Sequence, residues 1–247
     1  KKFSRCHDEI WEGGKKDPSI AFDEFTKILM VKIYDEIFTK SEKAYKFQII
    51  KNETKSQTST KIKEITNSVK TKFPIFKNKI NLSSNIIYEI VKQIQDVSFL
   101  RTELDVKGRA FENFLSKTFR DEYGQYFTPR PIVNFIVNFL DPTMEETIID
   151  PACGSGGFLV YSLKHVLDKF QSKGDNNLSN KIKDFSRKHL YGIEINERVS
   201  KVALIDMILH NGGSSNIICS NSLEDYKKID RNGKITPKKF SMLFTNP

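Results

Sequence analysis

The chain has 247 residues, of which 38% are hydrophobic and 29% charged, a balance that is typical of a folded globular protein and excludes a disordered one. No apolar run approaches the roughly 18–20 residues that a membrane span needs, no secretory signal is evident, and the first residue, Lys1, leads us to expect a fragment of a longer chain. The 40 basic and 31 acidic side chains leave a net charge of +9, which favours a phosphate-bearing partner, although a bias toward lysine and asparagine explains it equally well.

The first cluster of chemically active residues is the run Cys-His-Asp-Glu at residues 6–9. A closed zinc site needs about four ligands, and a helix start on the surface explains this run better. The other two cysteines, Cys153 and Cys219, are distant from Cys6 and from each other, so the sequence has neither a disulfide framework nor a Cys-x-x-Cys pair. We therefore expect no metal site and a reducing, cytoplasmic compartment.

Residues 1–106 are predicted to form an α-helical domain. Asp17 and Pro18 make a good helix start, because aspartate caps helices and proline suits the first helical position. Apolar residues then recur at spacings of three and four and predict one buried face: Phe22, Phe25, Leu29, Ile33 and Ile37. The same spacing predicts a later helix: Ile86, Ile90, Ile94 and Val97. Residues 51–60 (KNETKSQTST) are polar and lack periodicity, so we expect a loop or flexible linker there.

The sequence changes character after residue 106 and carries Gly-Gln-Tyr-Phe-Thr-Pro at residues 124–129. Thr128 can cap a helix whose first residue is Pro129. The apolar residues that continue this helix are Ile132, Val133, Ile136 and Leu140.

From residue 147 onward, the sequence alternates between strand and helix patterns. Short apolar runs predict four strands: 147–150, 189–195, 216–219 and 240–244. Longer amphipathic patterns predict helices near 158–170 and 197–210, whereas the polar residues 171–187 predict an insertion loop that can include a short helix. Strands joined by helices form a parallel sheet, so residues 107–247 are predicted to form an α/β domain.

Polar residues stand where each predicted strand ends: Asp150, Glu194, Asn221 and Asn246. In open parallel sheets, ligands bind outside the carboxyl ends of the strands, so we expect a site there. A carboxylate such as Glu194 can accept hydrogen bonds from both hydroxyls of a ribose.

A glycine-rich turn follows the first of these strands, in the run DPACGSGGF at residues 150–158. Glycines let the backbone approach a ligand closely, and the helix that follows offers unpaired N–H groups. A dinucleotide site needs Gly-x-Gly-x-x-Gly with an acid about 20 residues later, a spacing that Glu194 does not fit. No lysine follows the glycines as it does in nucleoside-triphosphate sites, so both alternatives are disfavoured.

These motifs resemble those of S-adenosylmethionine-dependent adenine methyltransferases, of the kind that forms the modification (M) subunit of type I restriction-modification systems. That family carries DPACGSGGF at its cofactor turn, Gly-Gln-Tyr-Phe-Thr-Pro upstream of it, and Asn-Pro-Pro followed by Phe or Tyr as its catalytic motif. The chain has the first two motifs, and of the third it has Asn246 and Pro247. The resemblance spans roughly residues 107–247 and implies a Rossmann-like methyltransferase fold behind the helical domain.

By this resemblance, the cofactor is S-adenosylmethionine, and three groups of residues would bind it. The upstream motif contributes Gln125, Tyr126, Phe127, Thr128 and Pro129. The glycine turn would hold the methionine part and contributes Asp150, Pro151, Ala152, Gly154, Ser155, Gly156 and Gly157. Glu194, with Ile195 beside it, would bind the ribose. The residues that would bind the adenine are Asn221, Ser222 and Leu223. Many relatives carry aspartate at the position of Asn221.

The implied reaction is N6-methylation of adenine in double-stranded DNA, within a restriction-modification or related defence system. The side-chain oxygen of Asn246 and the backbone carbonyl of Pro247 would accept hydrogen bonds from the exocyclic amine and orient its lone pair. The family also places an aromatic residue on the flipped base, and that residue is absent from this sequence.

The resemblance also implies partners. A specificity subunit or a downstream target-recognition domain would read the DNA, and a nuclease would be a further subunit or an upstream fusion. Because the sequence encodes only part of such a sheet, we expect the chain to be inactive alone. Two alternatives stay open: a methyltransferase that acts on RNA or protein glutamine, and a non-catalytic scaffold that binds cofactor or DNA.

Overall fold

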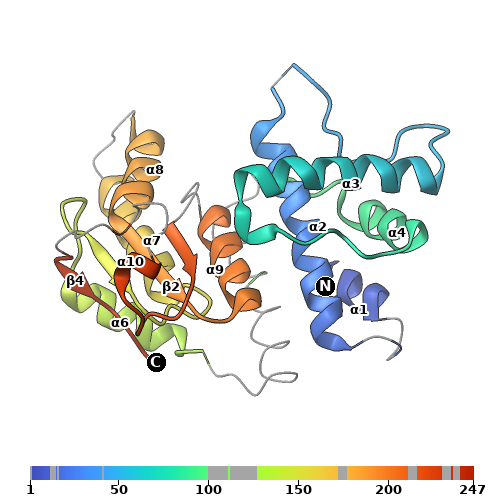
Figure 1. The fold of residues 1–247 in the computed structure, drawn as a ribbon. Helices are drawn as coiled ribbons and strands as arrows, with labels where there is room; N and C mark the ends of the chain where they lie inside the picture. The colour runs from blue at the N-terminus through green and yellow to red at the C-terminus, as the bar shows by residue number, and fades with distance from the viewer. Residues whose placement is uncertain are drawn as a thin grey trace. The chain divides into compact units, whose positions relative to one another are not determined.

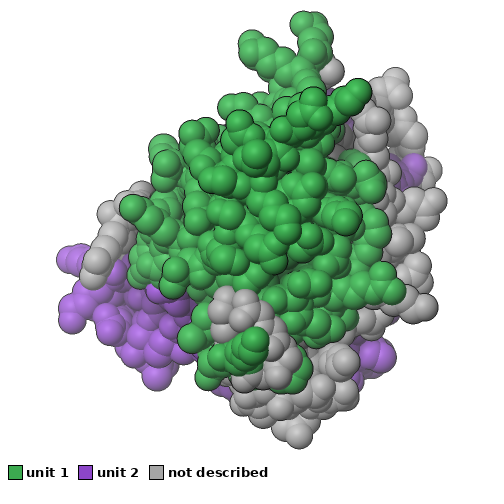
Figure 2. All heavy atoms as spheres, turned by 90° about the vertical axis from the view of Figure 1, so that its right-hand side faces the viewer, with its two compact units in different colours: residues 1–125 green, residues 126–247 purple. Residues whose placement is uncertain are grey.

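The computed structural model describes residues 2–11, 15, 17–40, 42–99, 111, 127–171, 177–210, 216–229, 235 and 240–247 (Figure 1). The chain divides into two compact units, residues 1–125 and residues 126–247, which Figure 2 draws in different colours. The first unit is helical and the second is built on a sheet, so the predicted fold class is confirmed. The predicted domain boundary after residue 106 stays a prediction. No helix in the described ranges is long and apolar enough to cross a bilayer.

The described elements of the helical unit are α1 (Lys2–Trp11), α2 (Pro18–Phe38), α3 (Lys55–Lys72), the 3-10 helix η1 (Pro74–Phe76) and α4 (Ser84–Ile94). Helix α2 begins as predicted, because Asp17 Oδ1 accepts a hydrogen bond from Ser19 N at 2.7 Å and Pro18 is the first helical residue. Its predicted apolar face is buried except at Ile37, which is 36% exposed. Helix α4 ends at Ile94, so Val97 lies beyond it.

Helix α1 contains the cysteine and histidine of the first sequence cluster. The predicted surface position is wrong for Cys6 and His7, which are buried in the helical unit, whereas Asp8 and Glu9 are exposed as expected. Burial raises the pKa of the Cys6 thiol to about 12, so this thiol stays protonated at neutral pH. Phe3 packs in the same core and stacks on Phe99 at 5.8 Å between ring centroids.

Helix α2 buries charged side chains as well as apolar ones. Lys27 Nζ lies 2.6 Å from Glu24 Oε1 and 2.8 Å from Asp23 Oδ2. Lys32 Nζ lies 3.1 Å from Glu36 Oε1. An unpaired ion inside a protein costs several kcal/mol. Because these lysines and carboxylates pair within the same helix, the charged residues of α2 can be buried along with its apolar ones.

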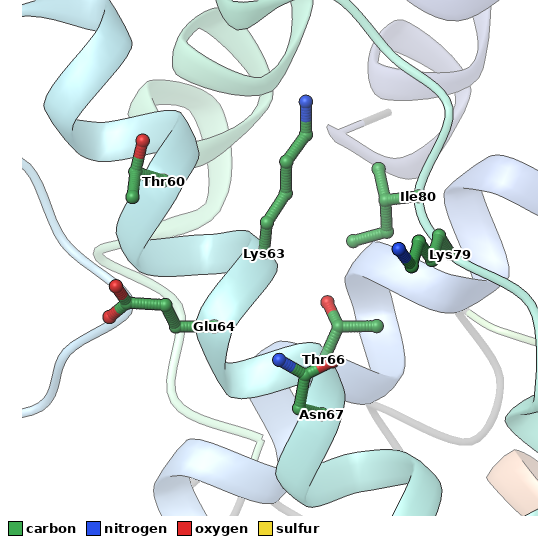
Figure 3. Close-up of a pocket in the computed structure, with 7 residues that line it drawn as sticks. All are labelled: Thr60, Lys63, Glu64, Thr66, Asn67, Lys79 and Ile80. Carbon is green, nitrogen blue, oxygen red and sulfur yellow. The ribbon is translucent and has the colours of Figure 1, made fainter.

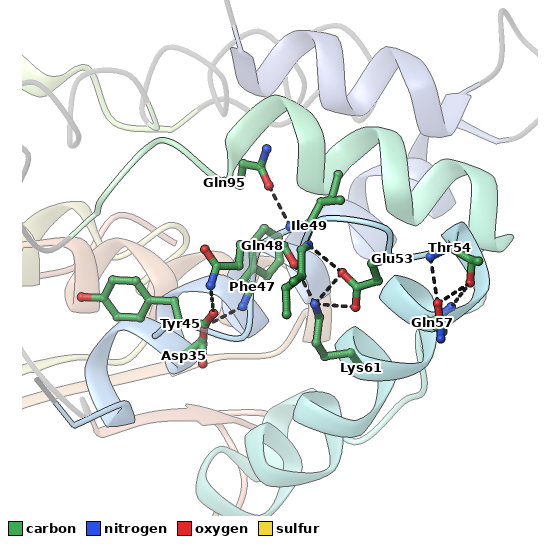
Figure 4. A network of polar contacts seen from close by, with 11 residues as sticks. Asp35, Tyr45, Phe47, Gln48, Ile49, Glu53, Thr54, Gln57, Lys61 and Gln95 are labelled. Carbon is green, nitrogen blue, oxygen red and sulfur yellow. Dashed lines mark hydrogen bonds and ion pairs between the residues drawn. The ribbon is translucent and has the colours of Figure 1, made fainter. Parts of the chain in front are cut away.

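The predicted loop at residues 51–60 is wrong from Lys55 onward, because α3 begins there. Thr54 and Gln57 form a capping box, in which Thr54 N donates to Gln57 Oε1 at 2.9 Å and Gln57 N donates to Thr54 Oγ1 at 3.3 Å. Figure 4 shows this box near the ion pair of Lys61 with Glu53, whose atoms are 2.7 Å apart. The Thr-x-x-Gln spacing is the signal for a helix start, and the buried residues Ile62, Ile65 and Val69 follow it at spacings of three and four.

A pocket of about 330 Å³ lies beside α3 in the helical unit (Figure 3). Its lining is mainly polar and charged: Thr60, Lys63, Glu64, Thr66, Asn67, Lys79 and Ile80. Lys63 also donates a hydrogen bond to the Leu82 carbonyl at 3.2 Å. Neither histidine nor cysteine is among these lining residues.

The second unit contains one sheet, in which the described strands are β1 (Ile148–Asp150), β2 (Leu190–Glu194), β3 (Asn216–Cys219) and β4 (Met242–Leu243). Their order is β3-β2-β1-β4, and each pairing is parallel, as predicted. Ile148 pairs with Leu190 on one side and with Met242 on the other. The chain therefore runs from β1 outward to β3 and then returns to the opposite side of β1, so the strand order reverses at β1.

The described helices of this unit are α6 (Arg130–Leu140), α7 (Gly157–Gln171), α8 (Leu178–His189), α9 (Glu197–Leu209) and the short α10 (Tyr226–Ile229). Helix α7 packs on β1, and α9 packs on β2 and β3. The helices predicted near 158–170 and 197–210 are thus confirmed. The region 171–187, predicted as an insertion loop that can include a short helix, contains most of the 12-residue α8, which buries Ile182 and Phe185.

Helix α6 contains the four apolar residues that predicted its continuation, so the helix is confirmed. Its buried residues are Val133 and Val137, whereas Ile132 and Leu140 are 50% and 45% exposed. Helix α6 packs on α7 through this narrow valine stripe, which sequence periodicity alone does not distinguish from its apolar neighbours.

We expect Thr54→Ala to lower the free energy of unfolding by about 1 kcal/mol, because the Gln57 N–H at the start of α3 loses its acceptor, Thr54 Oγ1. Urea denaturation measures this loss. The matched control is Ser56→Ala, at an exposed position of the same helical turn, which should change stability by less than about 0.5 kcal/mol. Equal effects of the two changes would contradict the capping role.

Candidate active site

The four polar residues predicted at strand ends lie at one edge of the sheet. Asp150 and Glu194 are the last residues of β1 and β2. Asn221 follows the end of β3 by two residues, and Asn246 follows the end of β4 by three. Because each strand pairing is parallel, the carboxyl ends meet at this edge. Asp150 is central there, since β1 lies between β2 and β4.

The turn after β1 requires glycine at two positions. Gly154 has φ +54° and Gly156 has φ +82°, both in the left-handed region. The backbone N–H of Cys153 donates to the Ile193 carbonyl at 2.9 Å, which ties the turn to β2. Helix α7 begins directly afterwards at Gly157, so its first N–H groups lie close to the strand ends.

Glu194 fastens this turn through both oxygens of its carboxylate. Oε2 accepts a hydrogen bond from Gly154 N at 3.0 Å, and Oε1 accepts one from Asn196 N at 2.7 Å. A carboxylate can accept about four hydrogen bonds, so Glu194 keeps capacity for about two further donors. The side chain can therefore hold the turn and bind a ligand at the same time.

Asp150 is a buried acid whose protonation is finely balanced. Its side chain is 1% exposed, and burial, together with the negative charge of Glu194, raises its pKa to about 7. Hydrogen bonds from Ala152 N, at 3.1 Å, and with the Thr245 side chain favour the ionised form and limit this rise in pKa. A positive charge placed near Asp150 would therefore shift it toward the carboxylate.

The segment 127–130 lies against the glycine turn and also contacts Asn246, which follows β4. The Phe127 ring lies 3.5 Å from the position that a Cβ on Gly154 would take. Thr128 Oγ1 accepts a hydrogen bond from Asn246 Nδ2 at 2.9 Å. The predicted helix cap at Thr128 is wrong, because α6 begins at Arg130 and no side chain caps it. Gln125 and Tyr126 of the same motif lie outside the described residues.

Arg130 is a site residue that the sequence does not single out. Its Nη2 donates to Ser155 Oγ at 3.3 Å and lies 3.8 Å from Asp206 Oδ2, a fully buried carboxylate on α9. Its Nη1 lies 2.0 Å from the position that a Cβ on Gly157 would take, so the guanidinium fills the space that this glycine leaves. The contact partners lie far along the chain, and the only local signal is an arginine directly after Thr-Pro.

Two exposed apolar side chains flank the ends of β2 and β3. Ile195 is 69% exposed and Leu223 is 93% exposed. In the turn after β3, Asn221 Oδ1 accepts a hydrogen bond from Leu223 N at 3.0 Å, and Ser222 is half-buried. An exposed leucine and isoleucine beside hydrogen-bonding groups suit a flat aromatic ring that is bound by its faces and edges.

The end of β4 is anchored in the sheet just before Asn246. The Phe244 N–H donates to the Ile149 carbonyl at 3.0 Å, and the buried Phe244 ring stacks on Phe158 at 5.3 Å between centroids. Asn246 and Pro247 themselves are exposed, one strand away from Asp150. The glycine turn and Asn246 therefore stand side by side at the point where the strand order reverses.

A family model described as N-6 DNA methylase matches residues 102–247, which is more than half of the chain. The chain belongs to the N-6 DNA methylase family. The family resemblance predicted from the three motifs is thus confirmed, and the matched range includes the whole strand-end edge described above.

Two curated relatives of this N-6 DNA methylase are named as parts of restriction enzymes. RM.BcgI, a type II restriction enzyme and methyltransferase from Heyndrickxia coagulans, is 29% identical over 133 residues, which are 53% of this chain and 20% of RM.BcgI. The methylase subunit of the type I restriction enzyme MjaVII from Methanocaldococcus jannaschii is 31% identical over 156 residues, or 62% of this chain and 24% of that subunit. The chain therefore spans about a quarter or less of these relatives.

A solved structure shows the same fold. The type I restriction-modification methyltransferase subunit from Streptococcus thermophilus aligns with 100% of this chain and 62% of its own, with a TM-score of 0.60 and 14% identity. The N-6 DNA methylase chain thus shares both its helical unit and its parallel sheet with a methyltransferase subunit.

We expect Gly157→Ala to lower the free energy of unfolding by about 1–3 kcal/mol. The new Cβ would displace the Arg130 guanidinium from Ser155 and from the buried Asp206, whose carboxylate also lies 3.2 Å from His210 Nδ1. Urea denaturation measures the loss.

A double-mutant cycle isolates this mechanism. In an Arg130→Ala background the space is already vacant, so Gly157→Ala should cost less than about 0.5 kcal/mol more. Fully additive losses would show that the glycine is needed for another reason.

Proposed function

We propose that this chain forms the cofactor-binding and catalytic part of a site-specific DNA adenine N6-methyltransferase of a restriction-modification system. The observation that carries this proposal is the placement of Asn246 one strand away from the glycine turn, in a chain of the N-6 DNA methylase family. The names of RM.BcgI and the MjaVII subunit place both relatives in restriction systems, which supports the same setting here.

The residues at the strand ends fit S-adenosylmethionine. The methionine part carries an ammonium group, which suits the buried Asp150, and the glycines leave the backbone open beside it. Glu194 has spare acceptor capacity for ribose hydroxyls. The exposed Ile195 and Leu223 would pack on the adenine ring, and Asn221 and Ser222 would meet its polar edge. When bound, this cofactor supplies an electrophilic methyl group on a sulfonium.

The chain's own contribution to the reaction is to orient and stabilise the target amine. The exocyclic nitrogen of adenine is a weak nucleophile, because its lone pair is delocalised into the ring. Asn246 Oδ1 and the Pro247 carbonyl would accept hydrogen bonds from that amine, direct its lone pair toward the glycine turn and stabilise the positive charge that develops on nitrogen. The base must leave the duplex to reach this edge of the sheet.

The remaining assignments concern partners. Double-stranded DNA fits the net charge of +9. A specificity subunit or a downstream target-recognition domain would select the sequence. A nuclease would act either as a separate subunit or in the same chain, as the name of RM.BcgI describes for that relative.

The test is methyl transfer by the complete protein that contains this chain, with labelled S-adenosylmethionine and duplex DNA. We expect label in N6-methyladenine after digestion, and a loss of about 100-fold or more in Asn246→Ala, because the main acceptor for the amine is gone. The control is Asn180→Ala, on the exposed face of α8, which should keep full activity. Label in RNA or in protein glutamine instead would overturn the DNA assignment, and cofactor binding without any transfer would favour a scaffold.

Cofactor affinity should rise with pH across neutrality. Asp150 with a pKa of about 7 must lose its proton before it pairs with the ammonium group, so binding weakens as pH falls below 7. We expect the Kd for S-adenosylmethionine to be about tenfold higher at pH 6 than at pH 7.5 by calorimetry. Asp150→Asn should bind more weakly and lose this pH dependence, whereas a profile unchanged by the substitution would contradict the role of Asp150.

A further inference from the structure

The contact between Thr128 and Asn246 joins residues that are 118 positions apart in the sequence. Asn246 Nδ2 donates and Thr128 Oγ1 accepts, at 2.9 Å. Thr128 is held in place from both sides, because Phe127 packs over Gly154 and Arg130 reaches Ser155 on the same turn. The threonine hydroxyl is therefore a fixed point beside an exposed asparagine.

This contact matters because a side-chain amide has two chemically opposite ends. Its oxygen accepts hydrogen bonds, and its nitrogen only donates them. An amine that is to be methylated must meet the oxygen, since the amide nitrogen would present hydrogens to hydrogens. A half-turn of the Asn246 amide would therefore reverse its chemistry without moving its backbone.

We propose that Thr128 is a positioning residue, which fixes the amide of Asn246 so that Oδ1 faces the target amine. This inference rests on the proposed function and adds to it the residue that sets the orientation of the amide. A threonine hydroxyl can also donate to an amide oxygen, but in this structure it accepts from Nδ2, so Oδ1 is the end that stays available. The hydrogen bond at Nδ2 also polarises the amide and makes Oδ1 a stronger acceptor.

The role differs from the cofactor contact that the family resemblance implies for Thr128. A cofactor contact changes the affinity for S-adenosylmethionine, whereas a positioning contact changes the rate of transfer once both substrates are bound. Thr128→Val removes the hydroxyl and keeps the shape of the side chain, and Thr128→Ser keeps the hydroxyl. The pair therefore separates loss of the hydrogen bond from a change of packing.

The experiment compares these variants in the complete protein, with saturating DNA and S-adenosylmethionine. We expect Thr128→Val to lower kcat about tenfold, with the Kd for S-adenosylmethionine changed less than about twofold, because one hydrogen bond to the amide is lost. Thr128→Ser should keep the wild-type kcat. The matched control is Thr143→Val, whose hydroxyl bonds to Glu146 in the loop before β1 and which should not change kcat.

A second measurement needs no catalysis. The side-chain amide protons of Asn246, observed by NMR on the 15N-labelled protein without cofactor, should shift in Thr128→Val and stay in place in Thr128→Ser. An unchanged kcat, a loss confined to the Kd, or unmoved amide resonances in Thr128→Val would each overturn the inference. A wild type that binds S-adenosylmethionine but methylates no DNA would instead overturn the proposed function, and the amide resonances would still decide the position of Asn246.

Discussion

The hydrogen bonds that Glu194 accepts from the backbone at Gly154 and Asn196 hold the strand-end edge together. The first fixes the turn that leads into α7, and the second fixes the residue that caps α9, since the Asn196 side chain accepts from the N–H groups of Arg198 and Val199. One carboxylate at the end of β2 thereby sets where two helices begin. Because those helices pack on β1, β2 and β3, the same residue links the shape of the glycine turn to the packing of the sheet. A ligand that binds Glu194 would bind to a group that is already immobilised, which lowers the entropy cost of binding.

Two buried carboxylates in this unit, Asp150 and Asp206, differ in the charges that surround them, and this difference suggests different roles for them. Asp206 is fully buried on α9 and has the Arg130 guanidinium 3.8 Å away, so its negative charge is opposed within the fold. The groups that act on Asp150 are a backbone N–H, the Thr245 side chain and the like charge of Glu194, and burial raises its pKa to about 7. The negative charge of Asp150 is therefore unfavourable in the unliganded protein, and a bound cationic ligand would stabilise it. Asp206 therefore suits a structural role and Asp150 suits a ligand that brings positive charge.

The sequence predicts those features that depend on neighbouring residues and fails where distant residues decide. The glycine turn, the four strands and the start of α2 at Asp17 follow from local patterns, and the parallel pairing then brings Asp150, Glu194 and Asn246 to one edge. The start of α3 is also local, in the Thr54 to Gln57 spacing, but polar composition hides it. Arg130 with Asp206 and Thr128 with Asn246 cannot be predicted from spacing, because each pair meets only after the sheet and its helices have formed. Thr128 shows how local patterns can mislead. A threonine before proline predicts a helix cap, whereas in the structure its hydroxyl accepts a hydrogen bond from Asn246.

The position of β4 places the two parts of the proposed site on neighbouring strands. After β3 the chain returns to the free side of β1, so β1 and β4 lie a single strand spacing of about 5 Å apart. The glycine turn follows one of these strands, and Asn246 follows the other. The segment 127–130 spans this gap, with Phe127 and Arg130 on the glycine turn and Thr128 on Asn246. A methyl donor held by the turn and an amine held by Asn246 would then be fixed by one continuous set of contacts. Under the proposed function, such alignment would remove much of the entropic barrier to group transfer, and the reversal of strand order at β1 would supply it.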